Sequence, residues 1–286
     1  MSHTAFVLSG GASLGAIQAG MLRALYERDI RPELIVGTSV GAINGAFIAA
    51  RPQTVATAEA LAGVWRGLRR GNAFPFNPIT GALGLLGTRD HLVPASGLTK
   101  IIERHVAAER FEDLPIPLHV VAVDVLTGAE LRLSDGLLHP AILASAAIPG
   151  VFAPVRWGDQ ILMDGGVANN TPISHAVELG ATRAYVLPTG HACALEEPPR
   201  GALGMTLHAL SLLTQQRLIA DVERHRDEIE LIVLPPPCPL RIPPVDFNHA
   251  DELIECGLAD ARAFLDGGGA ERPPIRMHIH RHDSVV

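Results

Sequence analysis

The chain has 286 residues, a formal net charge of −7 and a hydrophobic content of 48%. This composition excludes a mainly disordered chain and is sufficient for one large domain, or at most two small ones. The negative charge, together with an aromatic content of only 4%, argues against nucleic acid as a partner and against electrostatic binding to anionic membranes.

The first fifty residues predict strands that alternate with helices. Residues 4–9 form a short apolar run that suits a buried strand, and a glycine turn follows them at once. No basic segment precedes this run and the turn interrupts it. It is therefore neither a signal peptide nor a membrane span, and we expect a cytoplasmic protein with at most peripheral contact with a membrane. A helix, a second strand at 34–36 and an Ala-rich helix to about residue 50 follow. Such alternation predicts an α/β fold with a parallel sheet.

The rest of the chain continues this pattern with one exception. Residues 71–96 are apolar yet rich in proline and glycine, which is unusual for a plain surface loop. Helices are predicted at 55–69, 98–107, 140–147, from Pro172, at 203–228 and at 249–266, and strands at 118–125, 130–133, 151–155, 160–163, 184–187 and 229–234. The tail 267–286 is predicted to be flexible.

One segment has the pattern of a nucleophile on a strand-to-helix turn. Gly37-Thr38-Ser39-Val40-Gly41 matches G-x-S-x-G, with a predicted strand before it and a helix after it. In such a turn the flanking glycines let the backbone pass without Cβ clashes. Ser39 is therefore a candidate nucleophile. The alternative is a serine that only caps the helix.

A serine nucleophile needs a base, and the sequence offers histidines and one well-placed carboxylate. His175, His191 and His208 lie downstream, but none is in a glycine turn that would free it to reach a serine, so we interpret them as surface or packing residues. Asp164 ends a predicted strand and precedes Gly165-Gly166, at the edge where open α/β sheets place their sites. The alternative is an ordinary Asp-Gly-Gly hairpin turn.

A third motif leaves backbone N–H groups bare at the start of a helix. Gly10, Gly11 and Gly15 follow the first strand, and such a loop binds an anion, either a dinucleotide phosphate or a transient oxyanion. A dinucleotide fingerprint needs glycine where Ala12 stands and an acidic residue at the end of the second strand. The oxyanion interpretation therefore fits better.

With these parts in this order, the chain resembles the patatin-like phospholipase family over roughly residues 4–190. The segment 8–15 is similar to the family's Gly-rich oxyanion loop, and 37–44 to its nucleophile elbow. The segment 144–155 is similar to its Ala-Ser…Pro…Phe-x-Pro stretch, and 163–172 to its Asp-Gly-Gly box.

The resemblance implies a three-layer α/β/α fold with a mainly parallel central sheet. It implies a catalytic domain over 4–190, with residues 191–266 completing the same domain. It further implies a catalytic dyad of Ser39 and Asp164 without histidine, and an oxyanion hole made by the N–H groups of Gly10, Gly11 and Ala12. Gly15, Gly37, Gly41, Gly165 and Gly166 would support these motifs.

The activity implied by the resemblance is hydrolysis of carboxylic esters of lipids, of the phospholipase A, lysophospholipase or esterase type, through an acyl-enzyme. The partner would be a lipid or other acyl ester, and no metal or cofactor is required. Transfer of the acyl group to another alcohol, and a non-catalytic lipid- or acyl-binding protein that keeps the fold, stay open as alternatives. A nucleotide-binding oxidoreductase is a more distant one.

Two positions depart from the family pattern. Ala12 replaces a glycine, and Leu14 stands where the family carries Arg or Lys. We expect the oxyanion loop to survive, provided that φ of Ala12 is negative. Loss of the cation predicts that neutral esters or lysolipids are hydrolysed at least as well as anionic phospholipids. Residues 71–96 gain a candidate role as an acyl-chain wall or lid, with a core-packing loop as the alternative.

Overall fold

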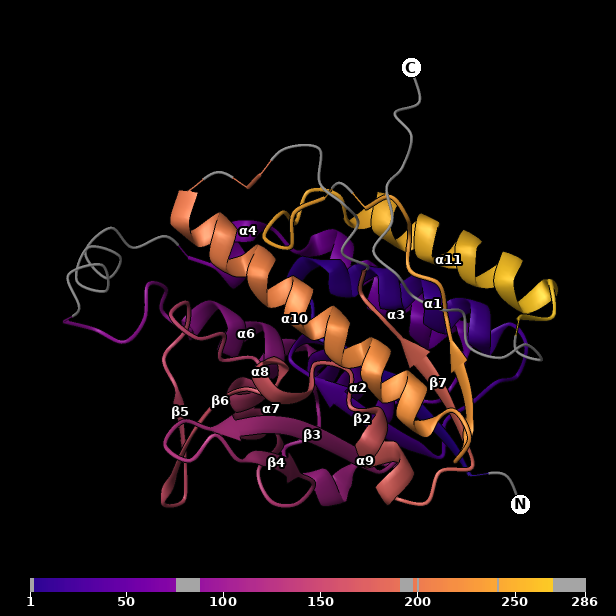
Figure 1. Cartoon of the computed structure of the whole chain (residues 1–286), viewed down its shortest axis with the longest axis horizontal. Coiled ribbons are helices and arrows are strands. Elements are labelled where there is room, and N and C mark those ends of the chain that lie inside the picture. The colour runs from indigo at the N-terminus through magenta and orange to yellow at the C-terminus, as the bar shows by residue number, and fades with distance from the viewer. Residues whose placement is uncertain (1–2, 76–87, 191–197, 200, 241, 270–286) are drawn as a thin grey trace.

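The computed structural model describes residues 3–75, 88–190, 198–199, 201–240 and 242–269 (Figure 1). In this part of the chain, eight strands form one sheet with the path β5-β6-β3-β2-β1-β7-β8, and β4 pairs with β3. The strands are β1 (Thr4–Leu8), β2 (Leu34–Thr38), β3 (Leu118–Asp124), β4 (Glu130–Leu133), β5 (Val155–Trp157), β6 (Gln160–Asp164), β7 (Arg183–Leu187) and β8 (Glu230–Val233). The pairs that β1, β2, β3, β7 and β8 make with one another are parallel, whereas β4, β5 and β6 pair antiparallel. The predicted mainly parallel sheet is confirmed.

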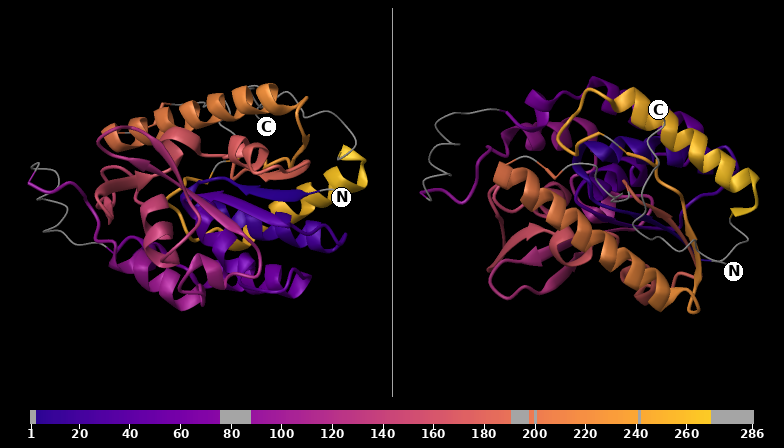
Figure 2. Two further views of the ribbon diagram at one scale, coloured as in Figure 1. Left: turned by 90° about the horizontal axis from the view of Figure 1, so that it is seen from below. Right: turned by 45° about the horizontal axis from the view of Figure 1, so that its top comes forward.

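Helices cover both faces of this sheet. They are α1 (Ala16–Tyr26), α2 (Val40–Ala49), α3 (Val55–Gly67), α4 (Arg70–Ala73), α6 (Ser96–His105), α7 (Leu138–Ser145), α8 (Gly166–Asn169), α9 (Ile173–Glu178), α10 (Gly201–His225) and α11 (Ala250–Asp266), with short 3-10 turns at Ala12–Gly15 and Phe111–Asp113. The left view of Figure 2 shows α10 above the sheet and α1, α3 and α11 below it.

The strand period of two decides which side chain enters which layer. In β1, Phe6 and Leu8 belong to the larger hydrophobic cluster, with α1, α2, α3 and α11. The alternate residues Ala5 and Val7 belong to the smaller cluster, with α9 and α10. All four side chains are fully buried. A central strand that is covered on both faces has a continuous run of apolar residues, as β1 does. The predicted three-layer arrangement is confirmed.

The segment after residue 190 packs on the same sheet and core. β8 pairs with β7, and α11 lies along α1 (Figure 1). Gly20 and Gly257 allow this close approach, because a Cβ at Gly20 would collide with the α11 backbone, and one at Gly257 would lie 2.6 Å from the carbonyl oxygen of Ile17. These contacts support our proposal that residues 191–266 complete the catalytic domain. Most of the predicted flexible tail lies outside the described residues.

The structure corrects the prediction of a strand at 151–155. The strand β5 begins only at Val155. Gly150 turns the chain with φ of 75°, and the carbonyl oxygen of Val151 accepts hydrogen bonds from the N–H groups of Leu92 and Val93. The carbonyl of Val151 is therefore engaged by residues 92 and 93 and not by a strand of the sheet.

Candidate active site

Two strands that run in opposite directions meet along one edge of β3. The middle of β3 pairs with both β2 and β4, so these strands lie on opposite edges. The end of β3 pairs with both β4 and β6, so β6 lies on the same edge of β3 as β2. Thr38, the last residue of β2, is paired with Val121, and Asp164, the last residue of β6, is paired with Ala122. Ser39, which follows Thr38, therefore lies next to Asp164.

Ser39 occupies a strained turn between β2 and α2. Its φ of 54° and ψ of −123° lie outside the backbone regions that residues other than glycine ordinarily adopt. Gly37 and Gly41 permit the turn, because a side chain at Gly37 would collide with the backbone of Gly41, and one at Gly41 with the end of β1. The Ser39 N–H donates to Ser145 Oγ at 2.8 Å, and that hydroxyl donates to the carbonyl of Val121 at 2.6 Å. The turn is thus tied to β3.

Asp164 is buried, with 6% of its surface exposed. Its Oδ1 accepts the N–H of Gly166 at 2.7 Å, and the Ser39 side chain lies close enough to lower the pKa of the carboxyl. Burial raises the pKa of Asp164 from 3.8 to about 6, although Ser39 and the N–H of Gly166 act in the opposite direction. A carboxylate that is ionised at neutral pH, yet has a raised pKa, is a better base than a free one.

The glycine loop after β1 touches Ser39 directly. A Cβ on Gly10 would lie 3.0 Å from the Cβ of Ser39 and would collide with the Asn170 amide. The carbonyl of Gly10 accepts the Thr189 hydroxyl at 2.6 Å and the Asn170 amide at 3.4 Å. Glycine is required at this position because the backbone passes between two side chains.

One donor of the predicted oxyanion hole has a partner within the protein. The N–H of Gly10 donates to the carbonyl of Asn170 at 3.1 Å. The N–H groups of Gly11 and Ala12 make no hydrogen bond within the described part of the chain. These two donors remain candidates for binding an oxyanion.

Ala12 does not have the negative φ that we expected. Its φ is 50°, because the chain turns sharply there from the end of β1 into the 3-10 turn. Only glycine adopts the left-handed region without cost, and another residue pays about 1–2 kcal/mol. Replacement of the family's glycine by alanine therefore strains the loop rather than leaving it unchanged.

The other predicted glycines lie where chain segments cross closely. A Cβ on Gly15 would meet Trp65 at 2.9 Å, and one on Gly166 would meet Asp164 Oδ1 at 3.0 Å. A Cβ on Gly165 would collide with the β3 backbone at Val121. These glycines let the helices and the Asp164 turn pack against the site.

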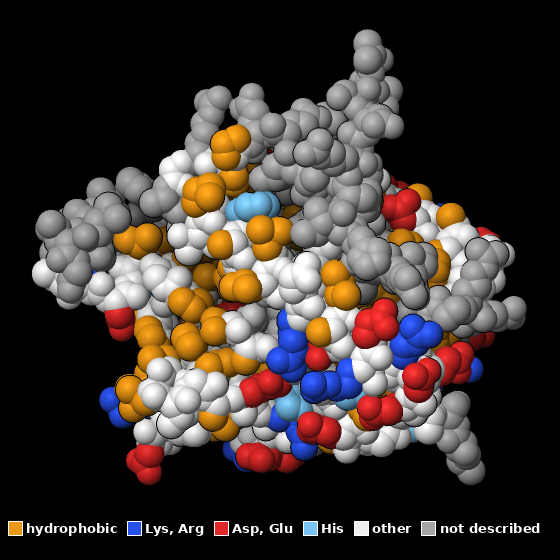
Figure 3. Space-filling model, viewed as in Figure 1, with side chains coloured by type: hydrophobic (Ala, Val, Ile, Leu, Met, Phe, Trp, Pro, Cys, Tyr) orange, Lys and Arg blue, Asp and Glu red, His pale blue; other side chains and the backbone are white. Residues whose placement is uncertain are grey.

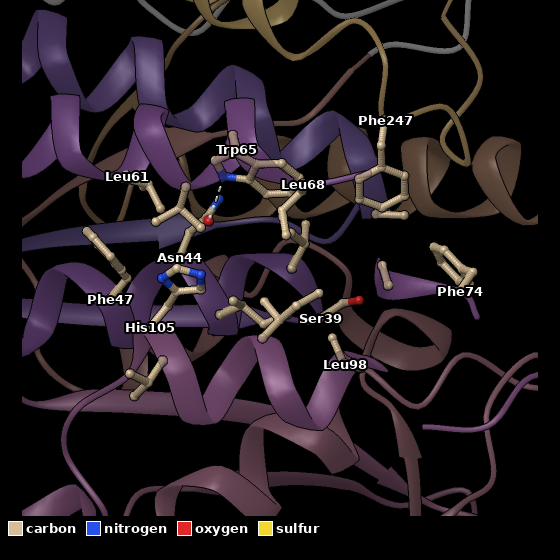
Figure 4. A pocket seen from close by; sticks show the side chains of 18 of the residues that line it. Ser39, Asn44, Phe47, Leu61, Trp65, Leu68, Phe74, Leu98, His105 and Phe247 are labelled. Carbon is tan, nitrogen blue, oxygen red and sulfur yellow. Dashed lines mark hydrogen bonds between the residues drawn. The ribbon is translucent and has the colours of Figure 1, made fainter. Parts of the chain in front are cut away.

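Ser39 lies at the junction of two pockets. The first, which we call the apolar slot, has about 710 Å³ of empty volume, part of it open to solvent. Its walls come from α2, α3 and α6, and Figure 4 shows Phe47, Leu61 and His105 at one end and Phe74 and Phe247 beyond Ser39 at the other. The amide of Asn44, in the wall of the slot, has partners within the protein. It accepts a hydrogen bond from the Trp65 indole N–H and donates one to the carbonyl of Gly15.

The second pocket, which we call the polar pocket, has about 1390 Å³ of empty volume, part of it open to solvent. It is bounded by the glycine loop, α8 and α10, and contains both Ser39 and Asp164. Its polar side chains include Asn170, Thr189 and His208. No Lys or Arg is among its described lining residues.

The sequence profile named Patatin-like phospholipase matches residues 6–177, which include the glycine loop, Ser39 and Asp164. The chain belongs to the patatin-like phospholipase family.

Curated relatives of this patatin-like chain are longer proteins. The patatin-like phospholipase domain-containing protein 7 of Mus musculus is 26% identical over 92% of this chain and 20% of its own length. An uncharacterized NTE family protein of Mycobacterium tuberculosis is 27% identical over 91% of this chain and 46% of its own length. The chain thus spans less than half the length of these relatives. Among solved structures, VipD from Legionella pneumophila has a TM-score of 0.49 at 15% identity and covers 93% of this chain and 67% of its own.

The histidines of this patatin-like domain lie in different places. His175 is buried, and its Nε2 lies 2.6 Å from the carboxylate of Glu130 at the start of β4, which agrees with its interpretation as a packing residue. His208 lines the polar pocket together with Ser39 and Asp164, a placement that the sequence did not indicate. His191 lies outside the described residues.

Two further residues of the site were not identified from the sequence as parts of it. Thr189 clamps Gly10, and Ser145 holds the Ser39 turn. Thr189 follows the carboxyl end of β7, the position where parallel sheets place their sites, and this signal could have found it. The partner of Ser145 is decided by tertiary packing alone.

Part of the predicted lid lies within the described residues. Residues 70–73 form the short helix α4, and Ala73 and Phe74 line the apolar slot. Residues 76–87 lie outside the described part, so a lid stays a prediction. Within the described residues, no three His, Cys, Asp or Glu side chains gather as metal ligands, and no helix is long and apolar enough to span a membrane.

Proposed function

We propose that this patatin-like chain hydrolyses carboxylic esters of lipids through Ser39 and Asp164. The observation that carries the proposal is the placement of Ser39 beside the buried carboxylate of Asp164, next to N–H groups of Gly11 and Ala12 that have no partner among the described residues. Nucleophile, base and oxyanion donors are the three groups that acyl transfer needs.

In the first half-reaction, Asp164 accepts the Ser39 hydroxyl proton while Oγ attacks the ester carbonyl. The oxyanion that forms is stabilised by the N–H groups of Gly11 and Ala12. Collapse of this intermediate breaks the bond to the alcohol, which takes the proton from Asp164 and leaves. Each preorganised donor of this kind is worth about 3–4 kcal/mol of barrier.

In the second half-reaction, water attacks the acyl group on Ser39. Asp164 is again ionised and accepts a proton from this water. The fatty acid leaves, and Ser39 recovers its proton. If an alcohol other than water took the acyl group, the same residues would catalyse acyl transfer, and analysis of the products distinguishes the two reactions.

The direct test is labelling with a fluorophosphonate probe, which bonds to an activated serine. We expect the wild type to label and Ser39→Ala and Asp164→Asn to label at least about a hundredfold more slowly. A folded wild type that fails to label, or labelling that persists in Ser39→Ala, contradicts the proposal. The first of these outcomes would favour a non-catalytic lipid-binding protein.

We further propose that lipids with an uncharged or zwitterionic headgroup are preferred. The polar pocket offers amide, hydroxyl and imidazole groups, and Leu14 lies where the family carries a cation. An anionic headgroup would thus have no opposite charge among the described lining residues. Rates on neutral and anionic lipids, compared in the wild type and in Leu14→Arg, test this preference. A strong wild-type preference for anionic lipid would contradict it.

The face that carries the polar pocket fits transient contact with a lipid surface. Val167, Met205 and Leu213 on α8 and α10 are 45%, 49% and 67% exposed. Figure 3 shows apolar side chains over α8 and the first half of α10, whereas charged side chains gather near the end of α10. Co-sedimentation with phosphatidylcholine vesicles should weaken in Leu213→Glu but not in Leu213→Met. Equal binding by both variants would exclude this face.

A further inference from the structure

From Ser39, the apolar slot runs along three helices in one direction and toward Phe74 and Phe247 in the other. The lining residues of α2 are Val40, Ile43, Asn44 and Phe47, one stripe at helical spacing that begins next to Ser39. The stripes on α3 and α6 extend from Leu68 to Leu61 and from Leu98 to His105. Figure 4 shows Leu61, Phe47 and His105 together at the end away from Phe74 and Phe247. The three helices therefore define one direction for the slot.

The helices also set its length. From Ser39 to Phe47 the chain advances eight residues, or about 12 Å at 1.5 Å per residue. From Leu98 to His105 it advances seven residues, or about 10 Å. A tetrahedral zigzag of carbon–carbon bonds advances about 1.25 Å per carbon. An extended chain that starts at Ser39 would thus reach the far end after about eight to ten carbons.

The chemistry of the walls fits a hydrocarbon chain. Among the described lining residues, the polar side chains are Ser39, Asn44 in the wall and His105 at the end away from Phe74 and Phe247, with the indole N–H of Trp65. The indole N–H of Trp65 donates a hydrogen bond to Asn44, and the Asn44 amide donates one to the Gln18 side chain at 2.8 Å. Burial lowers the pKa of His105, so its ring is mainly neutral at pH 7.

We propose that the apolar slot holds the acyl chain of the substrate and that His105 terminates it, which makes this chain selective for acyl groups of about eight to ten carbons. The alcohol part of the ester then occupies the polar pocket, on the other side of Ser39. This inference rests on the proposed function, since it assigns the substrate class of the same site.

The test uses p-nitrophenyl esters of increasing acyl length, below their critical micelle concentrations. For the wild type, we expect kcat/KM to rise by up to about fourfold per methylene as far as the decanoyl ester, and to fall beyond it. The informative quantity is the ratio of kcat/KM for the tetradecanoyl and octanoyl esters. Both values come from one protein sample, so partial unfolding of a variant cannot change the ratio.

His105→Ala removes the ring that ends the slot and should move the optimum about three carbons longer, with at least a tenfold higher ratio. His105→Trp should move the optimum shorter and lower the ratio. The matched control is His208→Ala, which changes a histidine of the polar pocket. It can alter rates, but it should leave the ratio within twofold of the wild type.

The outcomes separate this inference from the proposed function. If the butyryl ester is hydrolysed in a Ser39-dependent way but the length profile is flat, or the His105 variants keep the wild-type ratio, the slot assignment is wrong and the hydrolase proposal stands. A shift in His208→Ala instead would place the acyl chain in the polar pocket. If no ester is hydrolysed, both proposals are overturned.

Discussion

Replacement of Asp164 by asparagine should make the protein inactive and more stable. The carboxylate is buried, and its pKa is raised from 3.8 to about 6. The native state therefore holds a proton that the unfolded chain has already lost between these two pH values. Stability must fall as the pH rises from about 4 to about 6, and the loss persists above pH 6.

The magnitude follows from the interval between the two pKa values. At about 1.4 kcal/mol per pH unit, the raised pKa of Asp164 lowers the free energy of unfolding by about 3 kcal/mol at pH 8, where the native carboxyl is ionised, and by about 1 kcal/mol at pH 4.5, where only the unfolded chain is mostly ionised. Asparagine has the same shape and stays neutral, and its oxygen can still accept the N–H of Gly166. Asp164→Asn should thus raise the free energy of unfolding by up to these amounts.

Urea unfolding, followed by the fluorescence of Trp65 and Trp157, measures this difference at both pH values. Asp159→Asn is the control, because Asp159 is an exposed carboxylate in the turn before the same strand, and we expect changes below about 0.5 kcal/mol. An equal effect of Asp164→Asn at pH 8 and pH 4.5, or a destabilisation at pH 8, would refute the argument that burial of the charge sets the pKa.

Three further outcomes follow from the site. The kcat/KM should fall tenfold per pH unit below about pH 6, because Asp164 must be ionised to accept the Ser39 proton; a profile that is flat down to pH 4.5 would contradict its role as the base. Ala12→Gly should stabilise the protein by about 0.5–1 kcal/mol, since it relieves a φ of 50° but gives the unfolded chain more freedom; calorimetry showing a lower Tm would exclude strain at Ala12. Ser145→Ala should cost about 1–3 kcal/mol and reduce fluorophosphonate labelling, because the Ser39 N–H and the Val121 carbonyl lose their partner. A fully reactive Ser145→Ala would show that the turn holds its shape without this bond.

The sequence by itself determined the local parts of this protein. Strand, glycine turn and helix succeed one another at 4–26 and again at 34–49, and both units are found where the apolar patterns predict them. This success has a local cause, because hydrophobic period and turn-forming glycines act over a few residues. Ser39 on its turn and Asp164 at a strand end were identified for the same reason.

The tertiary structure decided how these parts meet. Ser39 and Asp164 are far apart in the chain, and they touch because β2 and β6 share one edge of β3. The N–H of Gly10 is consumed by Asn170, which no local pattern reveals. The two pockets likewise arise only where helices from separate segments face each other. Pairing and packing between distant segments depend on the whole chain, so local patterns could not predict them.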